Sequence, residues 1–228
     1  MQAARRLPDK EGSMSIYYQD DQVTLYHGDC LTEHREWLDA DVLVTDPPYG
    51  MSYGSNRVKG RKVERVAGDH DTAARDAAID AWGARPAIAF GRWNVERPAA
   101  VRARLIWSKG DDPGMGDLTF PWGNSDEEIY VLGNGFKGKR SANVLVHAKP
   151  PVNDRDAHPT PKPVSLMERL IEKCPPGAIA DPFAGSGATL IAARNLGRKA
   201  IGVEIEERYC EIIARRLSQG VLDFGGAA

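Results

Sequence analysis

Residues 178–204 contain the pattern that most restricts the fold of this 228-residue chain. A short apolar run, Ala178 to Asp181, leads into the turn Pro-Phe-Ala-Gly-Ser-Gly at 182–187; a helical stretch and a second apolar run, Ala200 to Glu204, follow. Two strands joined by a helix of this length lie parallel in one sheet, because the connection crosses over one face of the sheet instead of forming a hairpin. The sequence therefore predicts an α/β fold with a mostly parallel sheet.

The rest of the chain repeats this alternation of short apolar runs and amphipathic stretches. We expect further strands at Val23–His27, Asp41–Thr45, Pro86–Phe90, Arg104–Trp107 and Glu128–Leu132. We expect helices at Leu31–Leu38, Ala73–Trp82, Val164–Lys173, Ala188–Asn195 and Glu206–Leu217. Because no internal repeat or low-complexity tract interrupts the pattern, residues 1–228 are interpreted as a single domain.

Composition indicates the class of protein and its compartment. A hydrophobic fraction of 42% with 27% charged residues is ordinary for a globular protein with a sizeable core. The three cysteines, Cys30, Cys174 and Cys210, form no Cys-x-x-Cys pair, which favours free thiols and no metal site. No segment reaches the roughly 18 apolar residues of a membrane span, and residues 1–12 lack the apolar stretch of a signal peptide. We therefore expect a cytoplasmic protein with no membrane association.

The glycine-rich turn predicts a nucleoside cofactor. Gly185 and Gly187 let the backbone approach a ligand closely where a helix begins. Glu204, at the end of the next strand, is placed to accept hydrogen bonds from ribose hydroxyls. No Lys-Ser or Lys-Thr pair follows the glycines, so the turn is not a phosphate-binding P-loop. The alternative interpretation is a tight connection between a strand and a helix, as in any α/β protein.

The tetrapeptide Asp46-Pro47-Pro48-Tyr49, at the end of an earlier apolar run, indicates chemistry on an amino group. The exocyclic amine of adenine or cytosine is a poor nucleophile because its lone pair is delocalised into the ring. The Asp46 carboxylate and the Pro47 carbonyl can accept its hydrogens and localise that lone pair, while the two prolines fix the loop. Tyr49 offers an aromatic face to a base extruded from the duplex. A proline-stiffened turn is the alternative interpretation.

The tetrapeptide, its position ahead of the glycine-rich turn, and the element His-Pro-Thr-Pro-Lys-Pro at 158–163 resemble the beta group of S-adenosylmethionine-dependent DNA amino-methyltransferases. The resemblance covers most of the chain, from Val23 to Leu217. It implies a Rossmann-like class I methyltransferase fold of seven strands, the last antiparallel, flanked by helices. Because the catalytic half precedes the cofactor half, it also implies a circularly permuted strand order. Pro161 departs from the Gln that is usual in this family.

The resemblance also implies roles for individual residues. Asp29, in the element Gly28-Asp29-Cys30, would hold the adenine of the cofactor, and Thr160 and Lys162 would lie near its methionine carboxylate. The catalytic residues would be Asp46, Pro47, Pro48 and Tyr49. The predicted cofactor-binding residues are Asp29, Cys30, Asp46, Thr160, Lys162, Asp181, Phe183, Gly185, Ser186, Gly187, Thr189 and Glu204.

The first residue of the tetrapeptide points to the target base. Family members with Asp first mostly modify adenine N6, and those with Ser first mostly modify cytosine N4, so we expect adenine N6, with cytosine N4 as the alternative. RNA and protein-amide methyltransferases usually place the glycine-rich element first, and a 5-methylcytosine enzyme would need a Cys after a proline, which this chain lacks. A non-catalytic module that binds DNA or the cofactor is the alternative from another class.

Two basic segments predict contacts with double-stranded DNA, since the net charge of -2 makes any such contact depend on local clusters. The loop at 53–70 carries five cations against one acid between residues 57 and 65. The segment at 133–157 corresponds in position to the target-recognition segment of the family, and it carries a cluster of three cations at 137–140. The eight cations are Arg57, Lys59, Arg61, Lys62, Arg65, Lys137, Lys139 and Arg140. For each segment, a solvated loop is the alternative interpretation.

The short recognition segment predicts a short recognition sequence or low specificity, unless Trp93 and residues 122–124 contribute contacts. Trp82 and Trp107 are expected in the core instead. The sequence leaves open whether the protein forms a homodimer and whether it acts with a restriction enzyme. The small size favours a solitary or phage-type modification enzyme, in a bacterial cytoplasm or a phage-infected host cell.

Overall fold

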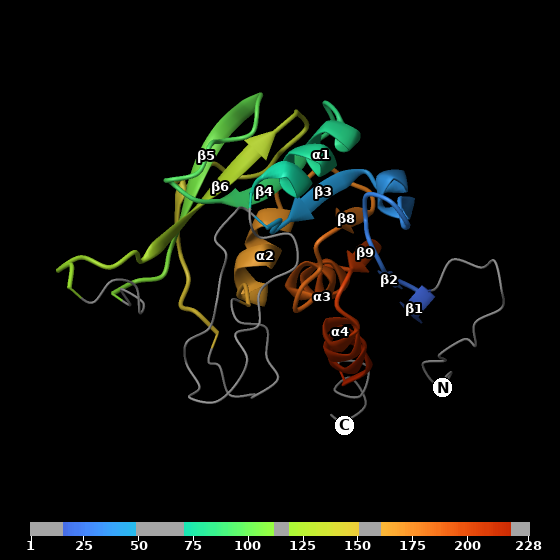
Figure 1. Cartoon of the computed structure of the whole chain (residues 1–228). Helices are drawn as coiled ribbons and strands as arrows, with labels where there is room; N and C mark the ends of the chain where they lie inside the picture. Colours follow the sequence, from blue (N-terminus) through green and yellow to red (C-terminus); the bar gives the residue numbers. More distant parts are fainter. Residues whose placement is uncertain (1–15, 49–70, 112–118, 151–160, 220–228) are drawn as a thin grey trace, which may run out of the picture.

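The described residues form one mixed sheet of nine strands in the order β1-β2-β9-β8-β3-β4-β6-β5-β7 (Figure 1). The computed structural model describes residues 16–48, 71–111, 119–150 and 161–219. The strands are β1 (Ile16–Gln19), β2 (Val23–His27), β3 (Val42–Thr45), β4 (Ala87–Gly91), β5 (Val101–Ser108), β6 (Asp126–Leu132), β7 (Val144–Val146), β8 (Ile179–Asp181) and β9 (Ala200–Glu204). The helices are the 3-10 helix η1 (Glu36–Asp39) and the α-helices α1 (Ala73–Trp82), α2 (Val164–Ile171), α3 (Ala188–Asn195) and α4 (Glu207–Gln219).

Seven of these strands, β2-β9-β8-β3-β4-β6-β5, form the sheet that the sequence predicts. The five from β2 to β4 are parallel, and β6 runs antiparallel to both of its neighbours. Two strands that the sequence pattern does not predict extend the sheet at its edges: β1 pairs antiparallel with β2, and β7 pairs parallel with β5. Both are edge strands of only four and three residues, too short for a sequence pattern to identify them as strands.

The permuted strand order is confirmed by the position of β3. This strand comes early in the chain, yet Val42 pairs with Ile179 and Leu43 with Ala180 of β8. On its other side β3 pairs with β4, so it lies near the middle of the sheet. The strand that leads into Asp46 is therefore the neighbour of the strand that leads into the glycine-rich turn.

Helices cover both faces of the sheet (Figure 1), with α1 on one face and α2, α3 and α4 on the other. Successive side chains of a strand point to opposite faces, and β3 divides accordingly. Val42 and Val44 pack in the cluster that includes residues of α2, α3 and α4, whereas Leu43 packs in the cluster with η1 and α1. Trp82 and Trp107 are both buried, as predicted. No helix in the described ranges is long and apolar enough to span a membrane.

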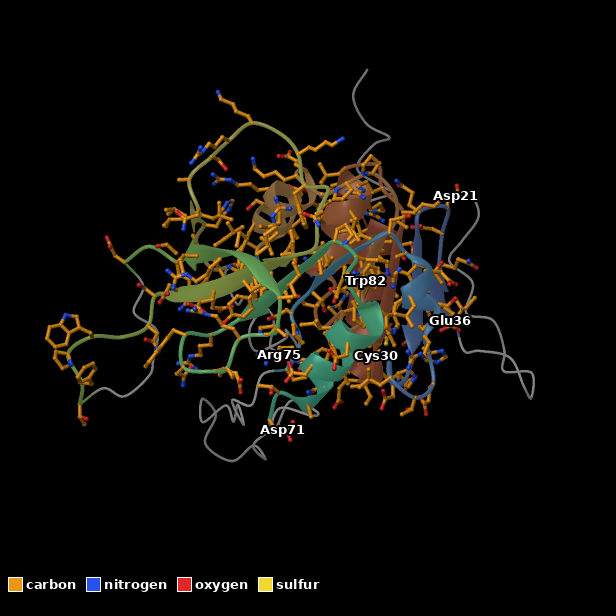
Figure 2. All side chains as sticks on the ribbon, turned by 90° about the horizontal axis from the view of Figure 1, so that it is seen from above. Asp21, Cys30, Glu36, Asp71, Arg75 and Trp82 are labelled. Carbon is orange, nitrogen blue, oxygen red and sulfur yellow. The ribbon has the colours of Figure 1, made fainter. Side chains whose placement is uncertain are left out.

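Helix α1 covers its face of the sheet with a buried arginine and a buried tryptophan. Figure 2 shows Arg75 and Trp82 along this helix, with Cys30 and Glu36 beside it. The ring of Trp82 stacks on that of Trp37 at 5.8 Å between centroids, and Arg75 donates to the Glu96 carbonyl at 2.7 Å. The buried guanidinium is thus hydrogen-bonded, as a buried charge must be to avoid a large desolvation cost.

The helix predicted at Leu31–Leu38 is wrong in its first half. Residues before Glu36 form turns around Asp29: its carboxylate accepts from the backbone N–H of Leu31 at 2.7 Å, and its carbonyl accepts from His34 at 2.9 Å. An Asp side chain that bonds the backbone two residues on favours a turn over a helix. Only the 3-10 helix Glu36–Asp39 remains of the prediction.

Candidate active site

The carboxyl ends of the parallel strands bring together three acidic residues that the sequence predicts as functional. Asp46 directly follows β3, Asp181 ends β8, and Glu204 ends β9. In open α/β sheets, ligands bind at this edge, where the strands end and the loops begin. Thr45 Oγ1 donates to Asp181 Oδ1 at 2.7 Å, so a buried hydrogen bond joins the end of β3, next to Asp46, to the start of the glycine-rich turn.

The Glu204 carboxylate organises the glycine-rich turn. Its Oε2 accepts from the backbone N–H of Gly185 at 2.7 Å, and its Oε1 accepts from that of Glu206 at 2.8 Å. Burial raises the pKa of Glu204 to about 7, because the two backbone donors offset only part of the lost hydration and Asp181 lies nearby. A buried acceptor beside a glycine-rich turn has the chemistry needed to bind ribose hydroxyls.

The two glycines of the turn have different structural requirements. Gly185 has φ +51° and Gly187 has φ +78°, both in the left-handed region that favours glycine. A Cβ at Gly187 would lie 2.8 Å from Ile213 Cγ1 on α4, so this glycine is required for helix packing. The prediction that both glycines serve close approach to the cofactor is therefore incomplete for Gly187. Ser186 is buried, and its carbonyl accepts from Arg216.

Asp181 is the most enclosed of the three acids. It is 2% exposed, and burial raises its pKa to about 6, although hydrogen bonds from Thr189 and Thr45 and from the backbone of Phe183 act in the opposite direction. The side chain is therefore committed to contacts within the protein. Its position supports a structural role at the start of the turn.

The segment Gly28-Asp29-Cys30 lies beside Glu204. The backbone N–H of Gly28 donates to the Glu204 carbonyl at 3.0 Å, which fixes the end of β2 next to the end of β9. The turn around Asp29 holds its carboxylate at this edge. Cys30 is buried, and burial raises the pKa of its thiol to about 12, so the side chain contributes packing. Asp29 and Glu204 thus provide acceptors that fit the amino and hydroxyl groups of an adenosine.

Asp46 pairs with Lys162 from the segment before α2. Lys162 Nζ donates to Asp46 Oδ2 and also lies 3.2 Å from Glu127 Oε2 on β6. Lys109 Nζ contacts the other oxygen of Glu127 at 2.6 Å. Burial raises the pKa of Asp46, against the attraction of Lys162 and with a further increase from Glu127. Although burial alone would raise the pKa of Glu127, the two ammonium groups hold it below its usual range.

Sequence reasoning missed part of this cluster. The resemblance implies that Lys162 lies near the cofactor's methionine carboxylate; the structure pairs it with two carboxylates of the protein, and its role toward the cofactor stays a prediction. Glu127 and Lys109 are absent from the predicted site. The available signal was an acidic run, Asp126-Glu127-Glu128, at the start of an otherwise apolar strand.

The structure describes only part of the predicted catalytic and DNA-binding set. Pro47 is buried and Pro48 half-buried, whereas Tyr49, Thr160 and the cations at 57–65 lie outside the described residues.

Lys137, Lys139 and Arg140 are exposed in the loop after β6. Leu132 at the end of β6 pairs with Ala87 at the start of β4. The loop after β6 therefore leaves the sheet at the amino ends of the parallel strands, whereas Asp46 lies at their carboxyl ends. The structure does not bring these three cations together with the catalytic loop.

Exposed aromatic residues do lie at the carboxyl ends of the strands, on the same side of the sheet as Asp46. Trp93, 63% exposed, follows the end of β4, and Trp122, 74% exposed, lies in the connection between β5 and β6. The ring of Trp122 contacts that of Phe120 edge to face at 5.6 Å between centroids. Trp93 and Trp122 therefore lie on the side of the sheet where the sequence prediction requires them for DNA binding. Their contribution to DNA binding stays a prediction.

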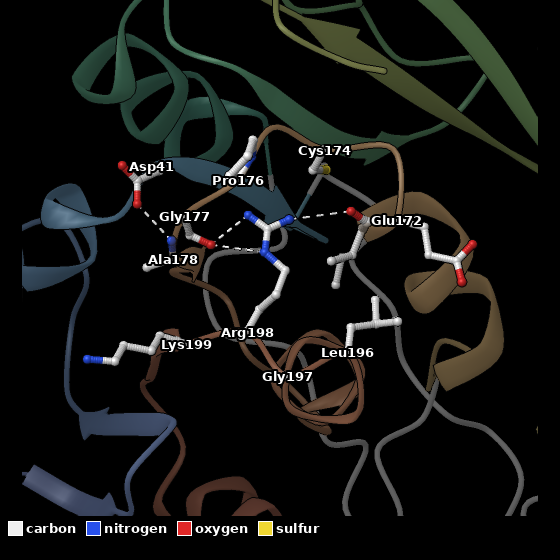
Figure 3. A pocket seen from close by; sticks show the side chains of 11 residues that line it. Asp41, Glu172, Cys174, Pro176, Gly177, Ala178, Leu196, Gly197, Arg198 and Lys199 are labelled. Carbon is white, nitrogen blue, oxygen red and sulfur yellow. Dashed lines mark hydrogen bonds between the residues drawn. The ribbon is translucent and has the colours of Figure 1, made fainter. Parts of the chain in front are cut away.

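A pocket at the opposite ends of the strands is lined by residues that hydrogen-bond to one another (Figure 3). The Arg198 guanidinium donates to the carbonyls of Gly177 and Pro175, each at 2.6 Å, and Asp41 accepts from the backbone N–H of Ala178 at 2.7 Å. These groups tie the start of β8 to neighbouring loops. Among the described residues, no group of three or more His, Cys, Asp or Glu is placed to hold a metal ion.

Comparison with known proteins identifies the family. Residues 106–215 match the N6/N4 methyltransferase model, described as DNA methylase. The type II methyltransferase M2.LlaDCHI of Lactococcus lactis subsp. cremoris is 45% identical over 248 residues, covering 90% of this chain and 92% of that protein. The M1.HpyAVI–SAM complex, at 21% identity, has a TM-score of 0.60 and covers 86% of this chain and 98% of that chain. The cytosine-N4-specific PvuII DNA methyltransferase, at 14% identity, has a TM-score of 0.64 and covers 91% and 93%. The chain therefore belongs to the S-adenosylmethionine-dependent DNA methyltransferases that modify exocyclic amino groups, the N6-adenine and N4-cytosine family.

Proposed function

We propose that this enzyme transfers the methyl group of S-adenosylmethionine to the N6 amino group of adenine in double-stranded DNA. The observation that carries the proposal is the state of Asp46. Its Oδ2 is held by Lys162, whereas its Oδ1 is buried and has no hydrogen-bond partner in the described part of the chain. A buried acceptor without a donor costs about 1–3 kcal/mol, and an amino group of a base would supply the donor.

The chemistry follows from acceptors placed on the amine. S-adenosylmethionine, when bound, supplies a methyl group on a positively charged sulfur, which makes the methyl carbon electrophilic. Asp46 Oδ1 and the Pro47 carbonyl accept the two amino hydrogens and localise the nitrogen lone pair for in-line attack. Formation of the nitrogen–carbon bond would break the carbon–sulfur bond, whose electron pair would stay on sulfur, and the amino nitrogen would lose a proton. The raised pKa of Asp46 suits it to receive that proton.

The cofactor would be held by Asp29, Glu204 and the backbone around Gly185. Asp29 would accept from the adenine amino group and Glu204 from the ribose hydroxyls. The support for this arrangement is the hydrogen-bonded contact between the ends of β2 and β9 and the Gly185 turn. Thr160 and Lys162 are proposed at the methionine end on the basis of the family resemblance.

Adenine is proposed over cytosine because Asp stands first in the tetrapeptide. The fold alone does not discriminate, since the cytosine-N4-specific PvuII enzyme has a similar fold. Cytosine N4 is therefore the second candidate, with the same roles for Asp46 and Pro47. In either case the target base must leave the duplex, since its amino group is otherwise engaged in base pairing. Tyr49 is proposed to stack on the extruded base.

DNA is proposed to approach the carboxyl edge of the sheet. The five cations at 57–65 follow the catalytic loop in the chain and would contact phosphates. Trp93 and Trp122 lie at this edge with exposed rings, and aromatic rings can stack on bases. Lys137, Lys139 and Arg140 leave the sheet at the other edge and are not assigned to the DNA held at Asp46.

The experiment that tests the proposal identifies the methylated nucleoside. The purified protein is incubated with S-adenosylmethionine carrying a tritiated methyl group and with unmodified bacterial DNA, and the DNA is digested to nucleosides. Label on N6-methyldeoxyadenosine supports the proposal, whereas label on N4-methyldeoxycytidine replaces the target base and keeps the mechanism. No label from a protein that binds the cofactor would contradict the proposed reaction and favour a non-catalytic module.

A further inference from the structure

Four charged side chains alternate in sign beside the catalytic loop. Lys162 Nζ bridges Asp46 Oδ2 and Glu127 Oε2, and Lys109 Nζ contacts Glu127 Oε1. The side chains of Asp46, Lys162, Glu127 and Lys109 are 22%, 5%, 13% and 13% exposed. Charges withdrawn from water to this extent are costly unless they are paired, so the four groups depend on one another.

The chain assembles this cluster from four separate places. Asp46 follows β3, Lys109 follows β5, Glu127 lies in β6, and Lys162 precedes α2. Pairing of Trp107 with Glu127 aligns β5 and β6, and the backbone N–H of Lys109 donates to the Ser125 carbonyl at 2.7 Å. The Lys162 ammonium lies 5.0 Å from the centroid of the Phe90 ring, which adds a cation–π contact. The position of Lys162 is therefore fixed from several sides.

Neighbouring acids on β6 have other partners. Glu128 is buried and pairs with Arg97 and Arg104, each at 2.9 Å. Since successive residues of a strand point to opposite faces, Asp126 and Glu128 point away from the face that carries Glu127. Within this acidic run, Glu127 alone has a described ion pair with the lysine that holds Asp46.

We infer that Glu127 is a positioning residue for methyl transfer: it shares the Lys162 ammonium with Asp46, so that Lys162 orients one oxygen of Asp46 without removing the acceptor strength of the other. The inference rests on the proposed function of Asp46. Without the Glu127 charge, two ammonium groups would face Asp46 with no second carboxylate to balance them. The Asp46 carboxylate would then bind the amino hydrogens less strongly and would be a poorer proton acceptor.

Glu127→Gln tests this electrostatic role. We measure single-turnover methyl transfer against pH at saturating S-adenosylmethionine and DNA, with Asp126→Asn as the matched control on the same strand. We expect Glu127→Gln to lower the rate constant by about tenfold or more, which is part of the hundredfold or more that a positioned acid–base group contributes. The acid limb of its pH profile should move to lower pH, because Glu127 raises the pKa of Asp46. Asp126→Asn should leave both the rate constant and the acid limb unchanged.

Lys162→Gln should move the acid limb of the pH profile in the opposite direction. Loss of this ammonium removes an attraction that lowers the pKa of Asp46, so the acid limb should move to higher pH. Opposite movements in the two variants are the signature of a shared ammonium. If Glu127→Gln gives the same rate constant and acid limb as Asp126→Asn, Glu127 has no role in methyl transfer. If it loses rate and thermal stability while its acid limb stays in place, Glu127 has only a structural role. Either result overturns the inference.

A second measurement separates this inference from the proposed function. The Asp46 carboxyl can be titrated by carbon-13 NMR without DNA, with Asp46→Asn to assign the signal. If the wild-type protein methylates no DNA, the proposed function fails. The titration still tests whether Glu127 and Asp46 share the Lys162 ammonium. A lower pKa of Asp46 in Glu127→Gln supports the sharing, and an unchanged pKa overturns it.

Discussion

The Thr45 hydroxyl, at the end of β3, donates a hydrogen bond of 2.7 Å to Oδ1 of Asp181, at the end of β8. Both side chains are almost fully buried, at 1% and 2% exposed. The bond ties the loop proposed to hold the target amine to the turn proposed to hold the cofactor. Residues 136 positions apart in the chain therefore fix the relative position of the two halves of the site.

Thr45→Val should lower the free energy of unfolding by about 1–3 kcal/mol, because it removes the shorter of the two hydrogen bonds that the buried Asp181 Oδ1 accepts, the other coming from the Phe183 backbone N–H at 3.2 Å. It should also raise the pKa of Asp181 further, since the lost hydrogen bond favours the charged form. Urea denaturation measures the first effect, and Thr45→Ser, which keeps the hydroxyl, is the control. Equal stability of the Val and Ser variants would show that the bond contributes little.

Asp46→Ala should reduce methyl transfer by about a thousandfold or more, as expected when a principal acceptor in the transition state is removed. Cofactor affinity should change little, because the proposed contacts with the adenosine part of the cofactor lie at the ends of β2, β8 and β9. Single-turnover assays and calorimetric titration with S-adenosylmethionine measure the two quantities. Retained turnover would remove Asp46 from the mechanism.

Glu204→Ala should weaken binding of S-adenosylmethionine by about 1–3 kcal/mol, the cost of losing charged hydrogen bonds to the ribose. The change also removes the acceptor for the Gly185 backbone N–H, which shapes the turn. Glu207→Ala, at an exposed acid on the first turn of α4, is the matched control. Identical titrations for the two variants would refute the role of Glu204.

The cofactor-free protein should lose stability as the pH rises from about 4 to about 7. Burial raises the pKa of Asp181 to about 6 and that of Glu204 to about 7, whereas both carboxyls ionise near pH 4 in the unfolded chain. The folded state thus holds protons that the unfolded chain has released. This contribution to stability is complete below about pH 4 and is lost as the pH passes through 6 and 7.

Glu204→Gln removes the share of this effect that belongs to Glu204. Relative to the wild type, its free energy of unfolding should increase between about pH 4 and pH 8 by about 3 kcal/mol. Urea denaturation of both proteins without cofactor, over a series of pH values, gives this difference. A difference that stays constant across the series would mean that Glu204 keeps an ordinary pKa in the folded protein.

Neutralising the five cations at 57–65 should flatten the dependence of DNA binding on salt. Each phosphate contact contributes a slope of about 0.9 in a plot of log affinity against log salt concentration. The control variant replaces Lys137, Lys139 and Arg140, which lie at the opposite edge of the sheet, and should retain most of the wild-type slope. A flatter slope in the control variant, with an unchanged slope in the variant at 57–65, would place the DNA on the other side of the molecule.

Local patterns in the sequence predict most of the fold, and they predict that Asp181, Glu204 and the glycine-rich turn lie together at one end of the strands. Val23–His27, Ala73–Trp82, Ala188–Asn195 and Ala200–Glu204 have the predicted bounds. A glycine with positive φ marks one end of each of the first three: Gly28, Gly83 and Gly187. The turn around Asp29 departs from prediction because a side-chain hydrogen bond outweighs a weak helical pattern.

Features that depend on distant pairing could not be read from local patterns. The contact between Lys162 and Glu127 requires β6 to lie against β4 and β5, and no period in the sequence specifies these neighbours. The same pairing decides the place of Lys137, because an antiparallel β6 carries the following loop to the edge opposite to Asp46. Strand direction, which the composition of a strand does not encode, therefore determines which basic cluster can be near the catalytic loop.

The permuted order also affects how the protein is made. In the sheet, β3 pairs with β8, where Val42 lies opposite Ile179, and β2 pairs with β9. Neither pair can form until the last third of the chain has left the ribosome. During that interval β3 lacks its β8 partner and β2 its β9 partner, and unpaired edges of apolar strands bind other chains readily. Expression at high concentration or truncation after β7 should consequently cause aggregation, since only the final two strands close the centre of the sheet.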